Sequence, residues 1–157
     1  MFGELDKQGI EQLLSHKLVG RLGCHADGIT YVVPLSYAYD RGYIYARTYE
    51  GMKIKFMRKN PKVCFQVDDT KELAYWQSVI CWGEFEELTE DAEIKQALQK
   101  LNDRKLPMLS SETMHITPEW PFPAAKNEKI DGIFFRIRLT EKTGRFEKIV
   151  GHEFFAT

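Results

Sequence analysis

The chain has 157 residues, with 22 Lys and Arg side chains against 23 Asp and Glu, which leaves a formal net charge of −1. A chain of this length with 43% hydrophobic residues can bury a core without disulfides or metals, which excludes disorder as its main state. We therefore expect a single domain over residues 1–157. The near-neutral charge argues against nucleic acid as a partner, because clustered positive charge is what binds a phosphate backbone.

The sequence also predicts neither a membrane span nor a signal peptide. No apolar stretch approaches the roughly 20 residues of a membrane span, and the first residues are charged in a helical pattern, unlike a signal peptide. We expect a cytoplasmic protein with no membrane partner.

Cysteine and histidine spacing points away from metal sites. Cys24, Cys64 and Cys81 lie in strand-like segments without CxxC spacing, which predicts reduced, buried thiols. The four histidines have no ligand spacing, so we predict no metal site; they are His16, His25, His115 and His152.

The first half of the chain predicts helices joined to strands by tight turns. Its expected elements are a helix over 6–15, strands over 18–26, 29–39 and 43–48, a helix over 50–59 and a strand over 61–69. Asp6 is a candidate N-cap, and Ile10, Leu13 and Leu14 follow at helical spacing. Asp27-Gly28 and Arg41-Gly42 predict hairpin turns, because such pairs tolerate positive φ angles.

The second half predicts one long strand over 74–88, a helix over 90–101 and a final strand from residue 132. Gly83 predicts a bulge or a close backbone approach in the long strand, and Thr143-Gly144 predicts a turn into a last short strand. Residues 102–129 are too rich in proline for a regular element. Together these elements predict a mainly β protein, an antiparallel barrel or sheet with peripheral helices.

The stretch from Arg47 to Lys59 is the most suggestive of chemistry. Arg47 and Thr48 end a strand, Gly51 follows, and Lys53 opens a helix, so a guanidinium, a hydroxyl, an ammonium and free backbone N–H groups could converge on one anion. Alternatively, the basic residues of 53–59 are only the solvated face of a short helix. Spacing alone does not decide between the two, since no phosphate-loop motif is present.

Several short motifs in a fixed order also resemble a known family. They are VVPLSY (32–37), YIYART (43–48), EGMK (50–53), KNPKVCFQVDD (59–69), SVICWGEFEEL (78–88) and the tail TGRFEK (143–148). This order resembles the pyridoxamine 5′-phosphate oxidase-related flavoproteins, and most closely the small nitroimidazole-resistance type. The resemblance implies an antiparallel split β-barrel with peripheral α-helices that binds FMN. It also implies a homodimer with the flavin at the subunit interface.

The resemblance further implies which residues contact the cofactor. One strand would follow the ring and ribityl chain, the segment up to Lys53 would hold the phosphate, and the long strand would approach from another side. The implied residues are Val32, Val33, Pro34, Leu35, Ser36, Ala46, Arg47, Thr48, Lys53, Ser78 and Val79. The proline-rich segment around Trp120 would cover the ring from the partner subunit.

Simpler roles for these residues stay open. Val32, Val33 and Leu35 are also what a core strand would contain, and Ser78 is equally well explained as a satisfied strand serine. Pro34 is more informative, because a proline removes a ladder donor and suits a strand edge, where backbone groups are free for a ligand.

Four departures from the family pattern limit what can be transferred. Tyr31 stands where the oxidase has a phosphate-binding arginine, and Ser36 stands where it has a vitamin-binding lysine. The arginine–histidine pair near the oxidase C-terminus has no counterpart. Ala46 replaces a histidine common in the nitroimidazole-resistance relatives. These departures argue against pyridoxamine phosphate oxidase activity.

The sequence thus predicts an FMN-dependent oxidoreductase that passes electrons from NAD(P)H to a small-molecule acceptor such as a nitro compound. The flavin would carry the redox chemistry, which explains why no catalytic side chain is recognisable. The alternatives are a non-catalytic flavin-binding or storage module, or a relative of the same barrel that binds haem or a deazaflavin.

Overall fold

The computed structural model describes residues 1–105 and 131–149. Over these ranges the strands are β1 (Phe2–Glu4), β2 (Val19–Ala26), β3 (Ile29–Ser36), β4 (Ala38–Asp40), β5 (Tyr43–Thr48), β6 (Lys62–Glu72), β7 (Tyr75–Leu88) and β8 (Ile133–Lys148). The helices are α1 (Lys7–His16), α2 (Met52–Lys59) and α3 (Asp91–Asn102). The proline-rich segment around Trp120, predicted to cover the flavin, lies outside the described residues.

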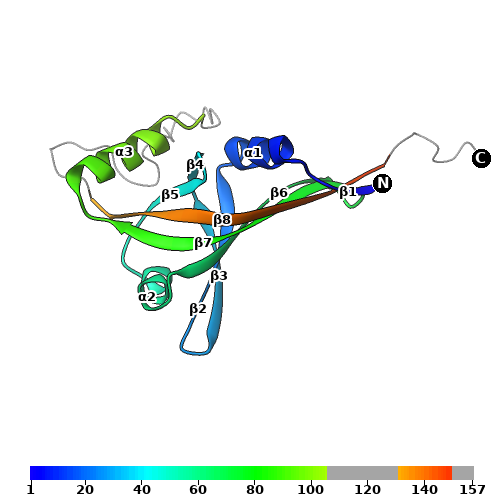
Figure 1. The fold of residues 1–157 in the computed structure, drawn as a ribbon. Coiled ribbons are helices and arrows are strands. Elements are labelled where there is room, and N and C mark those ends of the chain that lie inside the picture. Colours follow the sequence, from blue (N-terminus) through cyan, green and yellow to red (C-terminus); the bar gives the residue numbers. More distant parts are fainter. Residues whose placement is uncertain (106–130, 150–157) are drawn as a thin grey trace, which may run out of the picture.

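The strands form one antiparallel sheet in the order β3-β2-β6-β7-β8-β5-β4, with β1 paired to the far end of β8. The sheet curls until β3 lies close to β5, but no ladder joins these two strands. The result is a split barrel, which confirms the predicted fold class. In Figure 1, α1 and α3 lie on one side of the long β7–β8 pair and α2 lies on the other.

Local signals for turns and caps are confirmed. Asp27 and Gly28 have φ angles of 53° and 76°, and Arg41 and Gly42 have 47° and 85°, as hairpin turns of the predicted kind require. The Asp6 side chain caps α1 by accepting a hydrogen bond of 2.7 Å from the Gly9 backbone N–H. These features depend on neighbours in sequence, which is why the sequence predicts them.

The predicted strand over 29–39 is wrong as a single element. Strand pairing divides this segment in two, because β3 pairs with β2 whereas β4 pairs with β5. Tyr37 lies between the two strands with its side chain fully buried, and its hydroxyl donates to the Leu14 carbonyl at 2.7 Å. The break therefore lets one tyrosine tie the barrel to α1.

The predicted turn at Thr143-Gly144 is also wrong, since β8 runs straight through it. Gly144 pairs with Val79 on β7. A Cβ atom at Gly144 would lie 2.8 Å from Leu5 Cβ and 2.9 Å from Ile10 Cγ1. The glycine is thus required for the close approach of α1 and the chain before it, rather than for a turn.

Gly83 confirms the predicted close backbone approach, whereas the bulge lies on the neighbouring strand. Trp82 pairs with Glu141 and Gly83 pairs with Leu139, so Thr140 is the extra residue and the bulge is on β8, opposite Gly83. A Cβ atom at Gly83 would also lie 2.4 Å from the Arg138 backbone oxygen, so only glycine fits this close approach.

Two apolar clusters hold the fold together. The main core fills the barrel and includes the fully buried Leu14, Leu22 and Phe65. A smaller cluster joins α3 to the outer side of β5 and β8 through Leu101 and Phe134 among others. In the described ranges, no helix combines the length and the apolar character needed to cross a membrane.

A polar cluster beside the core connects α1, β4 and β8. Glu11 accepts hydrogen bonds from the Tyr39 hydroxyl and the Lys142 ammonium, and Lys142 also donates to the Tyr39 oxygen at 3.1 Å. Burial by itself would raise the pKa of Glu11, but the contacts with Lys142 and Tyr39 outweigh it and leave the pKa below the ordinary 4.5. Stability from this carboxylate is therefore present above pH 4.5 and is lost as the pH falls through the lowered pKa.

We expect Glu11→Gln to lower the free energy of unfolding at neutral pH by about 1 kcal/mol, a modest value because a third of the Glu11 side chain is exposed. The difference from the unmodified chain should shrink between neutral and acidic pH, as the pH falls through the lowered pKa of Glu11 and its side chain becomes neutral. Urea denaturation at fixed protein concentration measures it. The exposed Glu72→Gln is the control and should be neutral at both pH values; a Glu11→Gln deficit that persists in acid would contradict the assignment.

Candidate functional site

The edge strand β3 is the backbone of the candidate site. Among the strands that the structure describes, β3 is terminal in the sheet order and pairs only with β2. Pro34 lies in its middle, opposite Arg21 of β2, and its side chain is exposed. Because an edge strand leaves alternate backbone N–H and C=O groups unpaired, β3 can offer them to a ligand.

Helix α2 lies at the Tyr31 end of this strand. The rings of Tyr31 and Phe56 are in contact, with centroids 5.6 Å apart, and α2 also contacts β2. Gly51 at the start of the helix supplies no side-chain cap, so backbone N–H groups of the first turn have no side-chain acceptor from it. A half-buried Lys53 lies in this first turn.

Lys53 differs from the other cations of the helix. Arg58 pairs with Glu50 and Glu87, both at 2.7 Å, and Lys59 pairs with Asp27. For those two residues the alternative of an ordinary surface face holds. Lys53 has no ion-pair or hydrogen-bond partner within the described parts of the chain.

The positive charge of Lys53 acts on Cys24 of β2. Burial raises the pKa of the Cys24 thiol, and the positive charge of Lys53 offsets part of that increase. Cys24 pairs with Tyr31 across the hairpin, so the ammonium lies near the start of β3. A half-buried ammonium that no described residue neutralises, beside an open helix N-terminus, is a suitable place for an anion.

Arg47 does not join this group. Its guanidinium lies 5.1 Å from the centroid of the Phe134 ring, and its Nε donates to the Asp131 carbonyl at 2.7 Å. Phe134 belongs to the α3 cluster, whereas the neighbouring Ala46 belongs to the barrel core. The structure therefore directs the Arg47 and Lys53 side chains to different places, because strand alternation sends Arg47 to the side of the sheet opposite Ala46. A contact between Arg47 and a cofactor stays a prediction.

The other predicted residues form two groups, one that faces the barrel core and one that faces outward. Leu35, Ala46, Thr48 and Val79 are buried, and Val33 packs against the barrel core. These residues can offer a ligand only backbone groups, apart from the Thr48 hydroxyl. The exposed or half-exposed members are Val32, Pro34, Ser36 and Ser78.

These four lie on one surface, which we call the open face: the outward side of β3, β2, β6 and β7. Strand pairing places Pro34, Arg21, Gln66 and Ile80 in one row across it. The large apolar side chains on the open face are exposed to an unusual degree, namely Val19 (50%), Val32 (63%), Ile80 (37%) and Trp82 (40%). Apolar groups gathered in this way mark an interaction surface.

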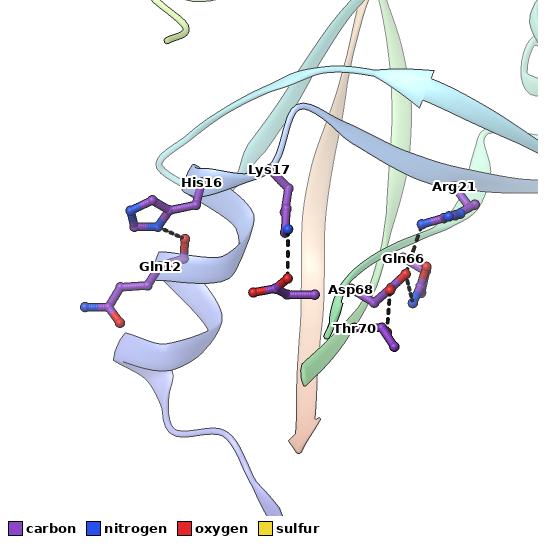
Figure 2. A network of polar contacts seen from close by, with 8 residues as sticks. Gln12, His16, Lys17, Arg21, Gln66, Asp68 and Thr70 are labelled. Atoms are coloured by element: carbon purple, nitrogen blue, oxygen red, sulfur yellow. Dashed lines mark hydrogen bonds and ion pairs between the residues drawn. The ribbon is translucent and has the colours of Figure 1, made fainter. Parts of the chain in front are cut away.

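A small polar network crosses the open face. Asp68 accepts from Arg21 at 2.9 Å and from Thr70 at 2.8 Å, and Gln66 reaches toward the same carboxylate (Figure 2). The Gln66 amide also donates to the Ser78 hydroxyl at 3.0 Å. Ser78 is thus held in place by β6 rather than pointing freely to solvent.

Gln66, Arg21 and Asp68 were not predicted as site residues. Gln66 and Asp68 alternate with the buried Phe65 and Val67, so the sequence carries the signal for their outward direction. What it lacks is the register that brings β6 between β2 and Ser78. Among residues 1–105 and 131–149, no group of three His, Cys, Asp or Glu side chains is placed to hold a metal ion.

Comparison of the sequence with known protein families gives a match over most of the chain. The sequence profile of the pyridoxamine 5′-phosphate oxidase family matches residues 6–146. The chain belongs to this family. The uncharacterised protein RA0666 of Rhizobium meliloti is 31% identical over 134 residues, which cover 81% of this chain and 83% of that protein.

Solved structures similar to this family member include a FAD-binding protein of Mesorhizobium loti. That structure has 32% sequence identity and a TM-score of 0.70, and the match covers 94% of this chain and 99% of the other. A candidate 5-nitroimidazole antibiotic resistance protein of Bacteroides thetaiotaomicron has the same fold, with 20% identity, a TM-score of 0.68 and coverage of 93% and 87%. The predicted family resemblance is confirmed.

Proposed function

We propose that this protein binds a flavin nucleotide along β3, with the phosphate at Lys53 and the ring toward Ser36. The observation that carries the proposal is the half-buried Lys53 ammonium at the open start of α2, which has no ion-pair or hydrogen-bond partner among residues 1–105 and 131–149. Family membership and the FAD-binding protein of M. loti support a flavin as the ligand.

The dimensions of β3 suit this ligand. Tyr31 and Ser36 are five residues apart, and at about 3.3 Å per residue the strand extends about 17 Å between them. This length is comparable with that of FMN from phosphate to ring. FAD contains the same portion, so the same residues would hold either nucleotide; we propose FMN, and the mass of the extracted cofactor separates the two.

We further propose that two copies of the chain meet through the open face, with the flavins between them. Val19, Val32, Ile80 and Trp82 would bury their exposed area against a second copy. In that arrangement Ser78, oriented by Gln66, would lie beside the cofactor bound by the other subunit.

The proposed activity is electron transfer from NAD(P)H to a small acceptor. A bound flavin supplies the hydride and electron transfer. The contributions of this chain would be a cation for the phosphate, unpaired backbone groups of β3 for the polar rim of the ring, and a dimer interface that excludes water.

The test is to purify the chain, record its visible spectrum and identify any extracted small molecule by mass. A flavin spectrum that bleaches under anaerobic NADH or NADPH and recovers on addition of nitrofurazone supports the oxidoreductase. A flavin that remains oxidised would instead indicate a binding or storage module. A haem Soret band, or no bound flavin after incubation with FMN and FAD, would overturn the proposal.

A further inference from the structure

A cavity of about 470 Å³ lies where the C-terminal ends of α1 and α3 approach β4. Four Lys and Arg side chains line it against two carboxylates; they are Lys17, Lys100, Arg104 and Lys105, with Asp40 and Asp103. A ligand can use this excess of positive charge only at cations that no carboxylate of the chain already neutralises.

Two of the four have a carboxylate partner. Lys17 pairs with Asp69 at 3.0 Å, and Lys100 pairs with Asp40 at 2.9 Å. Figure 2 shows Lys17 just after the C-terminal end of α1. Asp103 accepts a hydrogen bond of 2.7 Å from Gln99. Lys and His side chains at helix C-termini also balance the carbonyl groups there, so these residues need no ligand to explain them.

Arg104 is different because all of its hydrogen-bond partners among the described residues are neutral. Nε donates to the Leu101 carbonyl at 2.8 Å, and Nη1 donates to Ser36 Oγ at 2.7 Å and to the Tyr37 carbonyl at 3.2 Å. Its Nη2 group has no acceptor in the part of the chain that the structure describes. Three contacts fix the plane of the guanidinium and leave one edge available.

The surroundings of Arg104 favour an added anion. The side chain is half-buried, and burial lowers its pKa with no opposing carboxylate. A desolvated guanidinium without a counter-ion is unfavourable, and a carboxylate or phosphate oxygen is the acceptor that relieves this best.

The position of Arg104 connects the cavity to the proposed flavin site. Its bond to Ser36 places it at the end of β3 opposite the Lys53 end. If the flavin phosphate lies at Lys53, the flavin ring lies toward Ser36 and the cavity.

We propose that the cavity beside Arg104 binds the carboxylate or phosphate group of a small organic anion, which is the electron acceptor of this protein. The proposal rests on the proposed flavin function, since the flavin ring is what the acceptor must reach. It names a substrate class, and it assigns Arg104 and its neighbour Ser36 to substrate binding.

The experiment uses the full chain with its bound cofactor and a matched pair of probes, 4-nitrobenzoate and 4-nitrobenzamide. Calorimetric titration at low ionic strength should give at least about tenfold tighter binding of the carboxylate, because only it can pair with the guanidinium. Arg104→Gln should abolish this preference and leave the flavin spectrum and flavin content unchanged. Lys95→Gln, which removes a charge from the exposed side of α3, is the matched control and should retain the preference.

Arg104→Lys guards against loss of folding in the glutamine variant, and it should retain part of the preference because it retains the charge. Equal affinity of the unmodified protein for the two probes would overturn the proposal, as would a full preference in Arg104→Gln. A protein that binds neither FMN nor FAD but still prefers 4-nitrobenzoate would refute the proposed function and leave the anion site at Arg104 standing.

Discussion

Ile80→Glu is expected to convert the homodimer that we propose into a monomer with at least about a hundredfold weaker flavin affinity. Ile80 lies in the row of the open face that contains Pro34, Arg21 and Gln66, and its side chain is 37% exposed in the single chain. A two-fold interface would bury the introduced carboxylate twice without a partner. Light scattering for mass and flavin fluorescence for affinity measure the two effects.

Folding of this variant should be retained, because Ile80 points out of the barrel rather than into its core. The control is Leu73→Glu, which changes an exposed apolar residue in the connection between β6 and β7 and should leave mass and affinity unaltered. An Ile80→Glu protein that remains dimeric and yellow would remove the open face as the proposed interface.

Lys53→Ala is expected to weaken FMN binding about tenfold to a hundredfold, which is the effect of losing one charge-assisted contact with a phosphate. Riboflavin, which lacks the phosphate, should bind both proteins equally. Fluorescence titration with FMN and riboflavin therefore separates loss of a phosphate contact from a general change in the site.

Lys55→Ala provides the matched control, since it removes a lysine from the exposed face of the same helix. It should bind FMN as the unmodified chain does. If Lys53→Ala leaves the FMN affinity unchanged, or lowers FMN and riboflavin affinity alike, then Lys53 does not hold the phosphate.

The open face and the Lys53 site were predicted to different extents. The motif order indicated the family and the strand that would follow the flavin. The spacing around Gly51 indicated either an anion site that includes Arg47 and Lys53 or an ordinary solvated face made by the basic residues of 53–59. The structure separates them, because Glu50, Glu87 and Asp27 neutralise Arg58 and Lys59, while Arg47 lies over Phe134.

Features that depend on nearby residues follow directly from the amino-acid sequence. Positive φ angles at Asp27-Gly28 and Arg41-Gly42 place the hairpin turns, and helical spacing of apolar residues places α1 and α3. Each depends on backbone sterics or on a periodicity contained in about a dozen residues.

Features that depend on distant partners, in contrast, are set by how the folded chain packs. Gly144 permits close packing of Leu5 and Ile10 instead of a turn, and Tyr37 separates two strands because its hydroxyl reaches Leu14. In the same way, Ser78 is held by Gln66 of another strand, and Arg104 by Ser36. Strand register and long-range packing set these contacts, and a one-residue change of register would reverse which side chains face the site.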